Sequence, residues 1–274
     1  MNEDQATVSG FGDEWSRFDQ TGADAAELQR YFDSYFSVFP WQALPPNASG
    51  VDVGCGSGRW ANLVAQRVGS LHCIDASEQA LQVAKRNLAS RGNVAFTHAS
   101  VGRLPFEADH FDFGYSLGVL HHVPDTLAGL TECVRILKPG APFLLYLYYS
   151  LDNRPAWYRG VWQASNVVRK LVSRLPRTLK HAAADAAAAG VYWPLARTAL
   201  LGEKLGLDVS SVPLAAYRQN TFYVMRNDAL DRLGTPLEQR FSRIEIEAMM
   251  RRAGLTGIRF HEGTPFWCAV GTKV

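Results

Sequence analysis

The chain has 274 residues, of which 47% are apolar and 20% are charged, an ordinary composition for a soluble globular protein. Its net charge is only +2 and no run of Lys or Arg exceeds two residues, which argues against the clustered basic surface of a nucleic-acid-binding protein. The length suffices for one large core, or for a core domain with a smaller lid.

The cysteines and the apolar runs indicate the compartment. The first twelve residues are polar and acidic, without the apolar stretch of a signal peptide, and the longest apolar run (141–149) is too short to span a bilayer. No two cysteines have metal-ligand spacing, and no disulfide framework is suggested by Cys55, Cys73, Cys133 and Cys268. We expect a reduced, cytoplasmic protein with no membrane span and no metal.

The hydrophobic pattern predicts helices first and alternating elements afterwards. Aromatic residues at near helical spacing predict helical structure over 13–41, which Pro45 and Pro46 end. Five strands are then predicted at 50–53, 70–74, 94–97, 111–116 and 141–149, and three helices between them at 59–68, 78–89 and 124–137. Such alternation predicts right-handed crossovers and a parallel sheet.

The alternation stops near Ser150 and resumes about ninety residues later. The intervening stretch holds tryptophans, tyrosines, prolines and an alanine tract, and we expect a mostly helical insertion. Ser242 and Glu245 match a capping box that opens a helix. Two strands, predicted at 256–262 and 266–272, follow as a C-terminal hairpin.

A glycine-rich turn after the first predicted strand carries the main functional signal. It reads Val51-Asp52-Val53-Gly54-Cys55-Gly56-Ser57-Gly58-Arg59. Glycines let a bound ligand come within contact distance of the backbone because no side chain stands between them. The spacing is G-x-G-x-G, whereas the dinucleotide fingerprint is G-x-G-x-x-G. Cys55 in this turn is interpreted as a small filler and not as a nucleophile.

Further motifs follow the turn, and together they resemble the class I S-adenosylmethionine (SAM)-dependent methyltransferases. Asp75 ends the second strand, 17 residues past Gly58. The stretch 99–106 is similar to the adenine region of the family, although Ser100 stands where an aspartate is usual. The fourth strand with its exit, 111–123, and Leu137-Lys138-Pro139-Gly140 resemble the small-molecule branch. The resemblance covers about residues 45–150 and the C-terminal hairpin.

The resemblance implies SAM as cofactor and S-adenosylhomocysteine as product. In the family the glycine loop holds the methionine part, and the acid ending the second strand accepts hydrogen bonds from both ribose hydroxyls. The residues expected at the cofactor are Asp52, Gly54, Cys55, Gly56, Gly58, Asp75, Ala76, Ser100, Val101, Ser116 and Leu117.

The implied fold is α/β, with a doubly wound, mostly parallel seven-stranded sheet of the Rossmann-like methyltransferase type, a C-terminal antiparallel hairpin and a helical lid insertion. Four parts are expected: an N-terminal helical cap (1–45), a SAM-binding core (46–150), a helical substrate lid (151–240) and a C-terminal helix and hairpin completing the core (241–274).

Candidates for catalysis and substrate binding lie after the fourth and fifth strands. His121 and His122 follow the fourth strand, where a histidine near its ordinary pKa of about 6.5 can act as a general base, with His121 slightly preferred. A packing role beside the cofactor is the alternative. Aromatic side chains suit a flat, apolar or cationic acceptor, and the candidates for its binding are Trp15, Tyr146, Tyr148, Tyr223 and Trp267.

These features predict a SAM-dependent methyltransferase that acts on oxygen, nitrogen or carbon of a small-molecule metabolite. No nucleic-acid partner is expected, and an oligomer remains open. The alternatives are an RNA or protein methyltransferase, a non-catalytic SAM-fold protein that serves as a regulatory or partner subunit, and a nicotinamide oxidoreductase. An intact glycine loop with Asp52 and Asp75 disfavours the non-catalytic alternative.

Overall fold

The structure is a computed structural model that describes residues 2–274. The chain divides into two compact units. The first unit holds the residues up to Gln20 together with 28–150 and 237–274, and the second holds 21–27 and 151–236.

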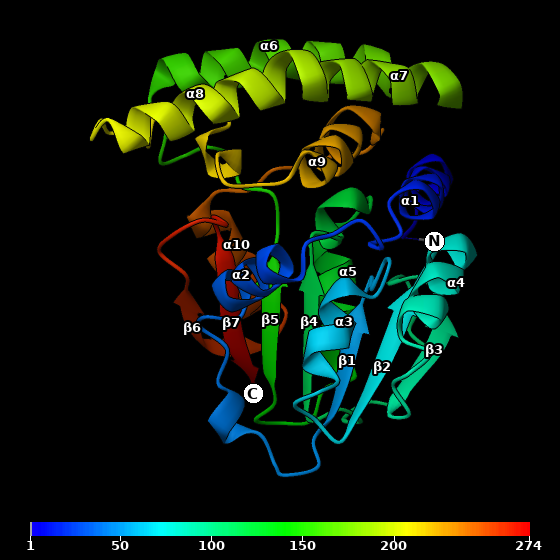
Figure 1. The fold of residues 1–274 in the computed structure, drawn as a ribbon. Coiled ribbons are helices and arrows are strands. Elements are labelled where there is room, and N and C mark those ends of the chain that lie inside the picture. The colour runs from blue at the N-terminus through cyan, green and yellow to red at the C-terminus, as the bar shows by residue number, and fades with distance from the viewer. Residues whose placement is uncertain (1) are drawn as a thin grey trace. The chain divides into compact units, whose positions relative to one another are not determined.

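A seven-stranded sheet in the order β3-β2-β1-β4-β5-β7-β6 forms the centre of the first unit (Figure 1). Its strands are β1 (Ser49–Val53), β2 (Ser70–Asp75), β3 (Val94–His98), β4 (Phe113–Leu117), β5 (Pro142–Tyr146), β6 (Leu255–Phe260) and β7 (Cys268–Lys273). The first five are parallel, and β7 pairs antiparallel with both β5 and β6. The predicted sheet, with its C-terminal antiparallel hairpin, is confirmed.

The strand order places a switch point between β1 and β4. The chain runs outward from β1 through β2 to β3 and then returns to β4 on the other side of β1. In open α/β sheets, ligands bind outside the carboxyl ends of the strands at such a point. The glycine turn at the end of β1 and the histidines after β4 both follow these two strands.

Helices cover both faces of the sheet because alternate strand residues point to opposite sides. The helices of this unit are α1 (Gln5–Arg17), α2 (Ala25–Tyr35, which starts in the second unit), α3 (Arg59–Val64), α4 (Glu78–Asn87), α5 (Thr126–Arg135) and α10 (Arg243–Arg252). Leu145 on β5 joins a core cluster with α5 and α10, whereas its neighbour Leu144 joins a second cluster with α2, α3 and α4. The sheet is therefore doubly wound.

The predicted helix starts rest on side-chain caps. The Ser77 hydroxyl accepts a hydrogen bond from the amide of Ala80 at the start of α4. The capping box of Ser242 and Glu245 at the start of α10 is complete, with both reciprocal hydrogen bonds present. Both expectations are confirmed.

Several predicted bounds are wrong. The helical stretch expected over 13–41 is two helices, because the first starts at Gln5, capped by Asp4, and the chain turns after Arg17 with Gln20 at φ 72°. α3 ends at Val64 instead of 68. β4 starts at Phe113, not 111, and β5 ends at Tyr146, not 149, because the neighbouring strands β4 and β7 offer no partner beyond Tyr146.

The second unit is built from helices, as the insertion was predicted to be. They are α6 (Ala156–Val172), α7 (Arg177–Ala187), α8 (Trp193–Lys204) and α9 (Phe222–Gly234), with a π-helical turn over Ala188–Tyr192 joining α7 to α8. α6 and α7 both pack on α9. The role of this unit as a substrate lid stays a prediction. No helix in the described part of the chain has the length and apolarity to cross a membrane.

Candidate functional site

The loop after β1 is a tight backbone turn held against β2. Gly54, Gly56 and Gly58 all have positive φ values (83°, 55° and 76°), which side chains rarely tolerate. The amides of Gly54 and Cys55 donate to the Ile74 carbonyl at 2.7 and 3.0 Å. A Cβ on Gly54 would lie 2.4 Å from Cγ2 of Val119, which follows β4. The turn is thus fixed at the carboxyl ends of β1 and β4.

Asp75 links this loop to the start of α4. Its Oδ2 accepts a hydrogen bond from the Gly56 amide (2.9 Å), and its Oδ1 accepts one from the Ser77 amide (2.8 Å). Burial raises the pKa of Asp75. A carboxylate has about four lone-pair sites, so two backbone donors leave acceptor capacity for a ligand. Its predicted role at ribose hydroxyls fits this capacity and stays a prediction.

Asp52 lies beneath the same loop and pairs with β4. Its side chain is 2% exposed, and its Oδ2 accepts a hydrogen bond from the Tyr115 hydroxyl at 2.8 Å. Burial raises the pKa of Asp52 to about 8, and the charge of Asp75 adds to the shift. The carboxyl is therefore mostly protonated at neutral pH, and it ties β1 to β4 below the loop.

Helix α1 lies against the loop and the start of α4. A Cβ on Gly56 would lie 2.8 Å from the Trp15 ring, and one on Gly12 would lie 2.6 Å from the Ser77 hydroxyl. The Arg59 guanidinium lies 5.3 Å from the Trp15 ring centroid. Trp15 is thus placed at the glycine loop, and its contact with a substrate stays a prediction.

The remaining residues expected at the cofactor take varied positions. Ser116 is fully buried and donates to the Val53 carbonyl (2.9 Å), so its side chain faces the core. The Ser100 hydroxyl accepts from the Gly102 amide at 3.3 Å.

Cys55 of the glycine loop is a neutral thiol. A hydrogen bond with Cys73, and then burial, raises the pKa of Cys55 well above its usual value. Val101, Leu117 and Ala76 complete the set; Val101 and Leu117 are buried, and the Ala76 carbonyl accepts from His98.

The histidine pair follows β4 in a short 3-10 turn (Leu120–His122), and the two side chains have different hydrogen bonds. His121 is completely buried, and its Nδ1 accepts from the Tyr148 amide at 3.4 Å, which places the proton on Nε2. His122 Nδ1 lies 2.7 Å from the Leu237 carbonyl and must carry the proton to donate there. The lone pair of neutral His122 is therefore on Nε2.

The premise that His121 titrates near its ordinary pKa is wrong. Burial lowers the pKa of His121 well below 6.5, and the neighbouring His122 and Arg240 lower it further. Within residues 2–274, His121 Nε2 is also a buried atom with no hydrogen-bond partner. The geometry makes His121 a neutral hydrogen-bond donor, so the slight preference for it as the base is not supported.

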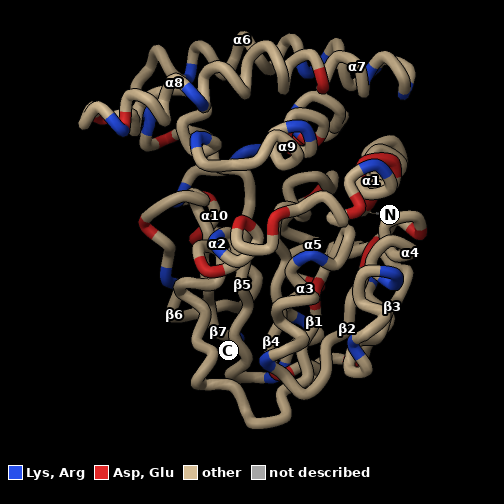
Figure 2. The backbone as a smooth tube through the Cα atoms, in the orientation of Figure 1, with Lys and Arg blue, Asp and Glu red and all other residues tan. Residues whose placement is uncertain are grey.

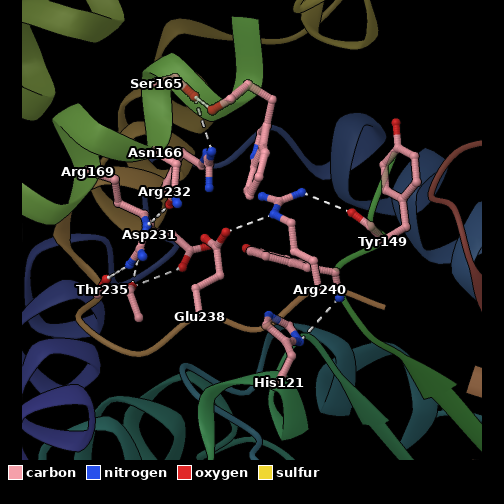
Figure 3. A network of polar contacts seen from close by, with 12 residues as sticks. His121, Tyr149, Ser165, Asn166, Arg169, Asp231, Arg232, Thr235, Glu238 and Arg240 are labelled. Atoms are coloured by element: carbon pink, nitrogen blue, oxygen red, sulfur yellow. Dashed lines mark hydrogen bonds and ion pairs between the residues drawn. The ribbon is translucent and has the colours of Figure 1, made fainter. Parts of the chain in front are cut away.

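The segment 237–241 holds the histidine turn, and the sequence did not indicate it. The Gln239 amide donates to the His121 carbonyl (3.0 Å), and the Phe241 amide donates to the Tyr148 carbonyl (2.9 Å). Arg240 pairs with Glu238 at 2.8 Å and donates to the Tyr149 carbonyl (Figure 3). Both side chains of the ion pair are largely buried. Only a pair of opposite charges two residues apart marks this segment in the sequence.

Tyr148 and Tyr146 lie at the exit of β5, and Tyr148 stacks on His121. Their ring centroids are 3.9 Å apart, and the Arg240 guanidinium lies 5.2 Å from the Tyr148 ring centroid. Tyr146 lies 6.0 Å from Tyr148 and 5.0 Å from Tyr35, measured between ring centroids. The structure brings both tyrosines together near the histidine turn.

The other two predicted substrate residues lie elsewhere. Trp267 is 7% exposed and belongs to the core cluster of α10, β6 and β7, where it contacts Phe260 and Phe266. Tyr223 belongs to the second unit, where a Cβ on Gly22 would lie 2.9 Å from its ring. Substrate contact by either residue stays a prediction. Among residues 2–274, no cluster of three or more His, Cys, Asp or Glu side chains could hold a metal ion.

Comparisons with known proteins agree with the geometry of the first unit. A family model described as a methyltransferase domain matches residues 51–145. The demethylmenaquinone methyltransferase of Staphylococcus aureus (strain MRSA252) is 43% identical over 94 residues, which cover 33% of this chain and 39% of the relative. The match thus spans about two-fifths of the length of such curated relatives.

Solved structures share the fold at low sequence identity. A SAM-dependent methyltransferase from Methanosarcina mazei has a TM-score of 0.51 at 17% identity, covering 85% of this chain and 95% of that one. A chain from a Haloferax volcanii complex with the Trm112 methyltransferase activator has a TM-score of 0.52 at 16% identity, covering 95% and 96%. The matched domain, the glycine loop and the sheet order thus agree on a methyltransferase domain over residues 51–145, of the kind found in class I SAM-dependent methyltransferases.

Proposed function

We propose that the protein is a methyltransferase that transfers the methyl group of SAM to a small or medium-sized metabolite. The observation that carries the proposal is the Asp75 carboxylate, which joins the glycine loop to the start of α4 and keeps acceptor capacity there. A two-oxygen acceptor beside a tight glycine turn suits a ligand with two neighbouring hydroxyls and a charged tail.

The loop residues fit this cofactor. Ser57 is 1% exposed, and its hydroxyl is a buried atom for which the described residues provide no hydrogen-bond partner. Buried polar groups are normally satisfied, so an unsatisfied one in a ligand loop is consistent with a partner supplied on binding. We assign the loop backbone of Gly54–Gly58 to the methionine part, Asp75 to the ribose, and Ser100 with Val101 to the adenine.

The chemistry asked of the protein is limited. SAM supplies a methyl group that is already activated by its positive sulfur. The residues of this chain have to position an acceptor and exclude water, and such positioning can lower a barrier by several kcal/mol, about 7–11 at the upper end. For a hydroxyl or an acidic carbon they also have to accept a proton.

We assign proton transfer to His122 and hydrogen bonding to His121. His122 has its lone pair on Nε2 because Nδ1 donates to Leu237, whereas the lone pair of His121 already accepts from Tyr148. Neutral His121 can donate through Nε2 to an acceptor oxygen. Tyr148 stacks on the His121 ring, and the Arg240 guanidinium lies over the Tyr148 ring. These contacts keep the His121 ring in place.

The chemical nature of the methyl acceptor is our inference. The Staphylococcus aureus relative is named for a demethylmenaquinone, and the aromatic rings of Tyr146 and Tyr148 are compatible with a flat acceptor of that kind. The atom that receives the methyl group is an oxygen, a nitrogen or a carbon.

Incubation with methyl-labelled SAM and a metabolite extract, followed by mass spectrometry, tests the function. We expect a labelled small product that depends on the intact glycine loop, with Gly54→Val as the inactive control. Saturable SAM binding without any labelled product would favour the non-catalytic alternative, and labelled RNA or protein would replace the small-molecule acceptor.

A further inference from the structure

Helix α6 in the second unit carries its apolar residues on the outside. Trp157, Val161, Val168 and Leu171 recur at spacings of four, seven and three residues, which places them along one side of the helix. They are 53%, 53%, 51% and 63% exposed. We call these four residues the α6 stripe. Single exposed apolar residues are normal on protein surfaces, but an ordered row of them is not.

The inner side of the same helix is only partly apolar, because its two buried residues are Val172 and Arg169. Ser165 accepts a hydrogen bond from Arg232 of α9, and Arg169 is buried and donates to the carbonyls of Thr235 and Pro236 (Figure 3). A surface helix of a globular protein normally turns most of its apolar residues toward the core. The α6 stripe is therefore not explained by the packing of the second unit.

The exposed apolar surface continues along the chain after α6. Helices α7 and α8 and the turns beside them add Leu175, Leu179, Val191, Trp193, Leu201 and Leu205, all of them exposed. Two of the exposed side chains, Trp157 and Trp193, are tryptophans, the residue type that prefers the boundary between water and lipid.

The charge around the stripe selects one kind of partner. Residues 154–180 contain seven Lys and Arg and no Asp or Glu, and the whole stretch 151–236 contains twelve basic against six acidic residues. Arg159 and Lys170 are exposed on the same helix and Arg174 is exposed just after it, and Figure 2 shows basic positions along α6 and α7. A second copy of this chain would bring the same positive charge and be repelled.

We propose that α6 and the start of α7 dock the protein on the surface of an anionic lipid bilayer. Amphipathic helices with exposed tryptophan and leucine and with basic residues beside them lie in the membrane interface without crossing it. Each Lys or Arg near an anionic surface strengthens binding by about fivefold. The inference is independent of the proposed function and assigns the second unit a role in addition to any lid.

Vesicle sedimentation with the full chain tests the proposal. At 150 mM salt we expect binding to vesicles of phosphatidylcholine with phosphatidylglycerol at least tenfold tighter than to phosphatidylcholine alone. The triple variant R159Q/K170Q/R174Q should lose at least tenfold. The double variant V168Q/L171Q should also lose at least tenfold, because its two apolar side chains no longer enter the interface. Glutamine is a good helix former, and these positions are exposed, so both variants should fold.

A matched variant, K85Q/R86Q/R252Q, removes three exposed basic residues of the first unit and should stay within twofold of the natural chain. Circular dichroism melting curves verify folding, and Leu171→Gln alone serves if the double variant unfolds. The proposal is overturned if the natural chain ignores anionic vesicles or if the control loses as much as the triple variant. It is equally overturned if V168Q/L171Q instead converts a dimer to a monomer, or if a single-stranded RNA binds more tightly than the vesicles.

Discussion

The two units differ in the apolar side chains that they leave exposed, although each has a buried apolar cluster. In the first unit, the helices bury apolar residues against the sheet, and polar groups gather at the carboxyl ends of β1, β2 and β4. In the second unit, α6 turns Arg169 inward and Leu171 outward. The first unit therefore gathers its polar groups where parallel strands end, whereas the second leaves a row of apolar side chains in contact with solvent.

The largest expected effect comes from the glycine loop. Gly54→Val places a branched side chain at φ 83°, where its Cβ would lie 2.4 Å from Val119. Left-handed backbone costs a residue with a side chain about 1–2 kcal/mol before any clash is counted. We expect SAM binding to fall at least hundredfold, measured by equilibrium dialysis. Gly160→Ala is the control, since a Cβ there meets nothing within 4 Å. Wild-type affinity in Gly54→Val would break the assignment of the loop.

The next largest effect is expected at the histidine turn. His122→Ala should lower turnover of the identified acceptor about 10²-fold or more if His122 accepts the proton. His121→Ala should have a smaller effect, about tenfold, because it removes one hydrogen bond. Initial rates at saturating SAM measure both. An equal loss in the two variants, or a larger loss in His121→Ala, would reverse the assigned roles.

Replacement of Asp75 should weaken SAM binding at constant fold. Asp75→Ala leaves the ribose hydroxyls and the Gly56 and Ser77 amides without their acceptor, which corresponds to about 1–3 kcal/mol, or roughly five- to 150-fold in affinity. Asp75→Asn keeps one acceptor oxygen, so its affinity for SAM should fall between those of the natural chain and Asp75→Ala. Isothermal titration gives the affinities. Unchanged affinity in Asp75→Ala would contradict the ribose assignment while leaving the fold intact.

Asp52 makes the stability of the first unit depend on pH. Its pKa is raised to about 8 in the folded state against about 3.9 in an unfolded chain, so the folded protein binds one more proton between these values. Stability from this group is complete below about pH 4 and is lost as pH rises through about 8, with a slope of at most about 1.4 kcal/mol per pH unit. Asp52→Asn should flatten the unfolding free energy between pH 5 and 8 in urea titrations; the same slope in the variant would refute the burial argument.

The smallest effect is expected in the second unit. Leu171→Gln replaces a side chain that is 63% exposed, so the free energy of unfolding should change by no more than about 0.5 kcal/mol, and SAM affinity should not change. Chemical denaturation and titration measure the two. A loss above about 2 kcal/mol would show that the α6 stripe packs on protein, which would remove the contrast between the units.

The sequence predicts the first unit well because its signals are local. Gly54, Gly56 and Gly58 mark a turn that few other residues can form, and Ser77 and Ser242 mark helix starts three residues from their partners. The contact between Leu237 and His122 joins residues 115 positions apart, and no local pattern reveals it. The lowered pKa of His121 follows from that same long-range packing and could not be predicted.

The second unit shows what the sequence alone does not predict. Composition predicts helices over 151–240, but which side of α6 faces the protein depends on where Arg232 and Thr235 lie after folding. The apolar pattern of Trp157, Val161, Val168 and Leu171 alone would be assigned to a buried side. Only the exposure of these residues in the structure reverses that interpretation.

Calorimetric titration of the intact chain with SAM, and separately with NADH, tests the central claim most directly. The loop of Gly54–Gly58, with Asp75 bound to its backbone, predicts saturable one-to-one binding of SAM and none of NADH. Binding of NADH in preference to SAM, or no heat and no thermal shift with SAM, would contradict the account.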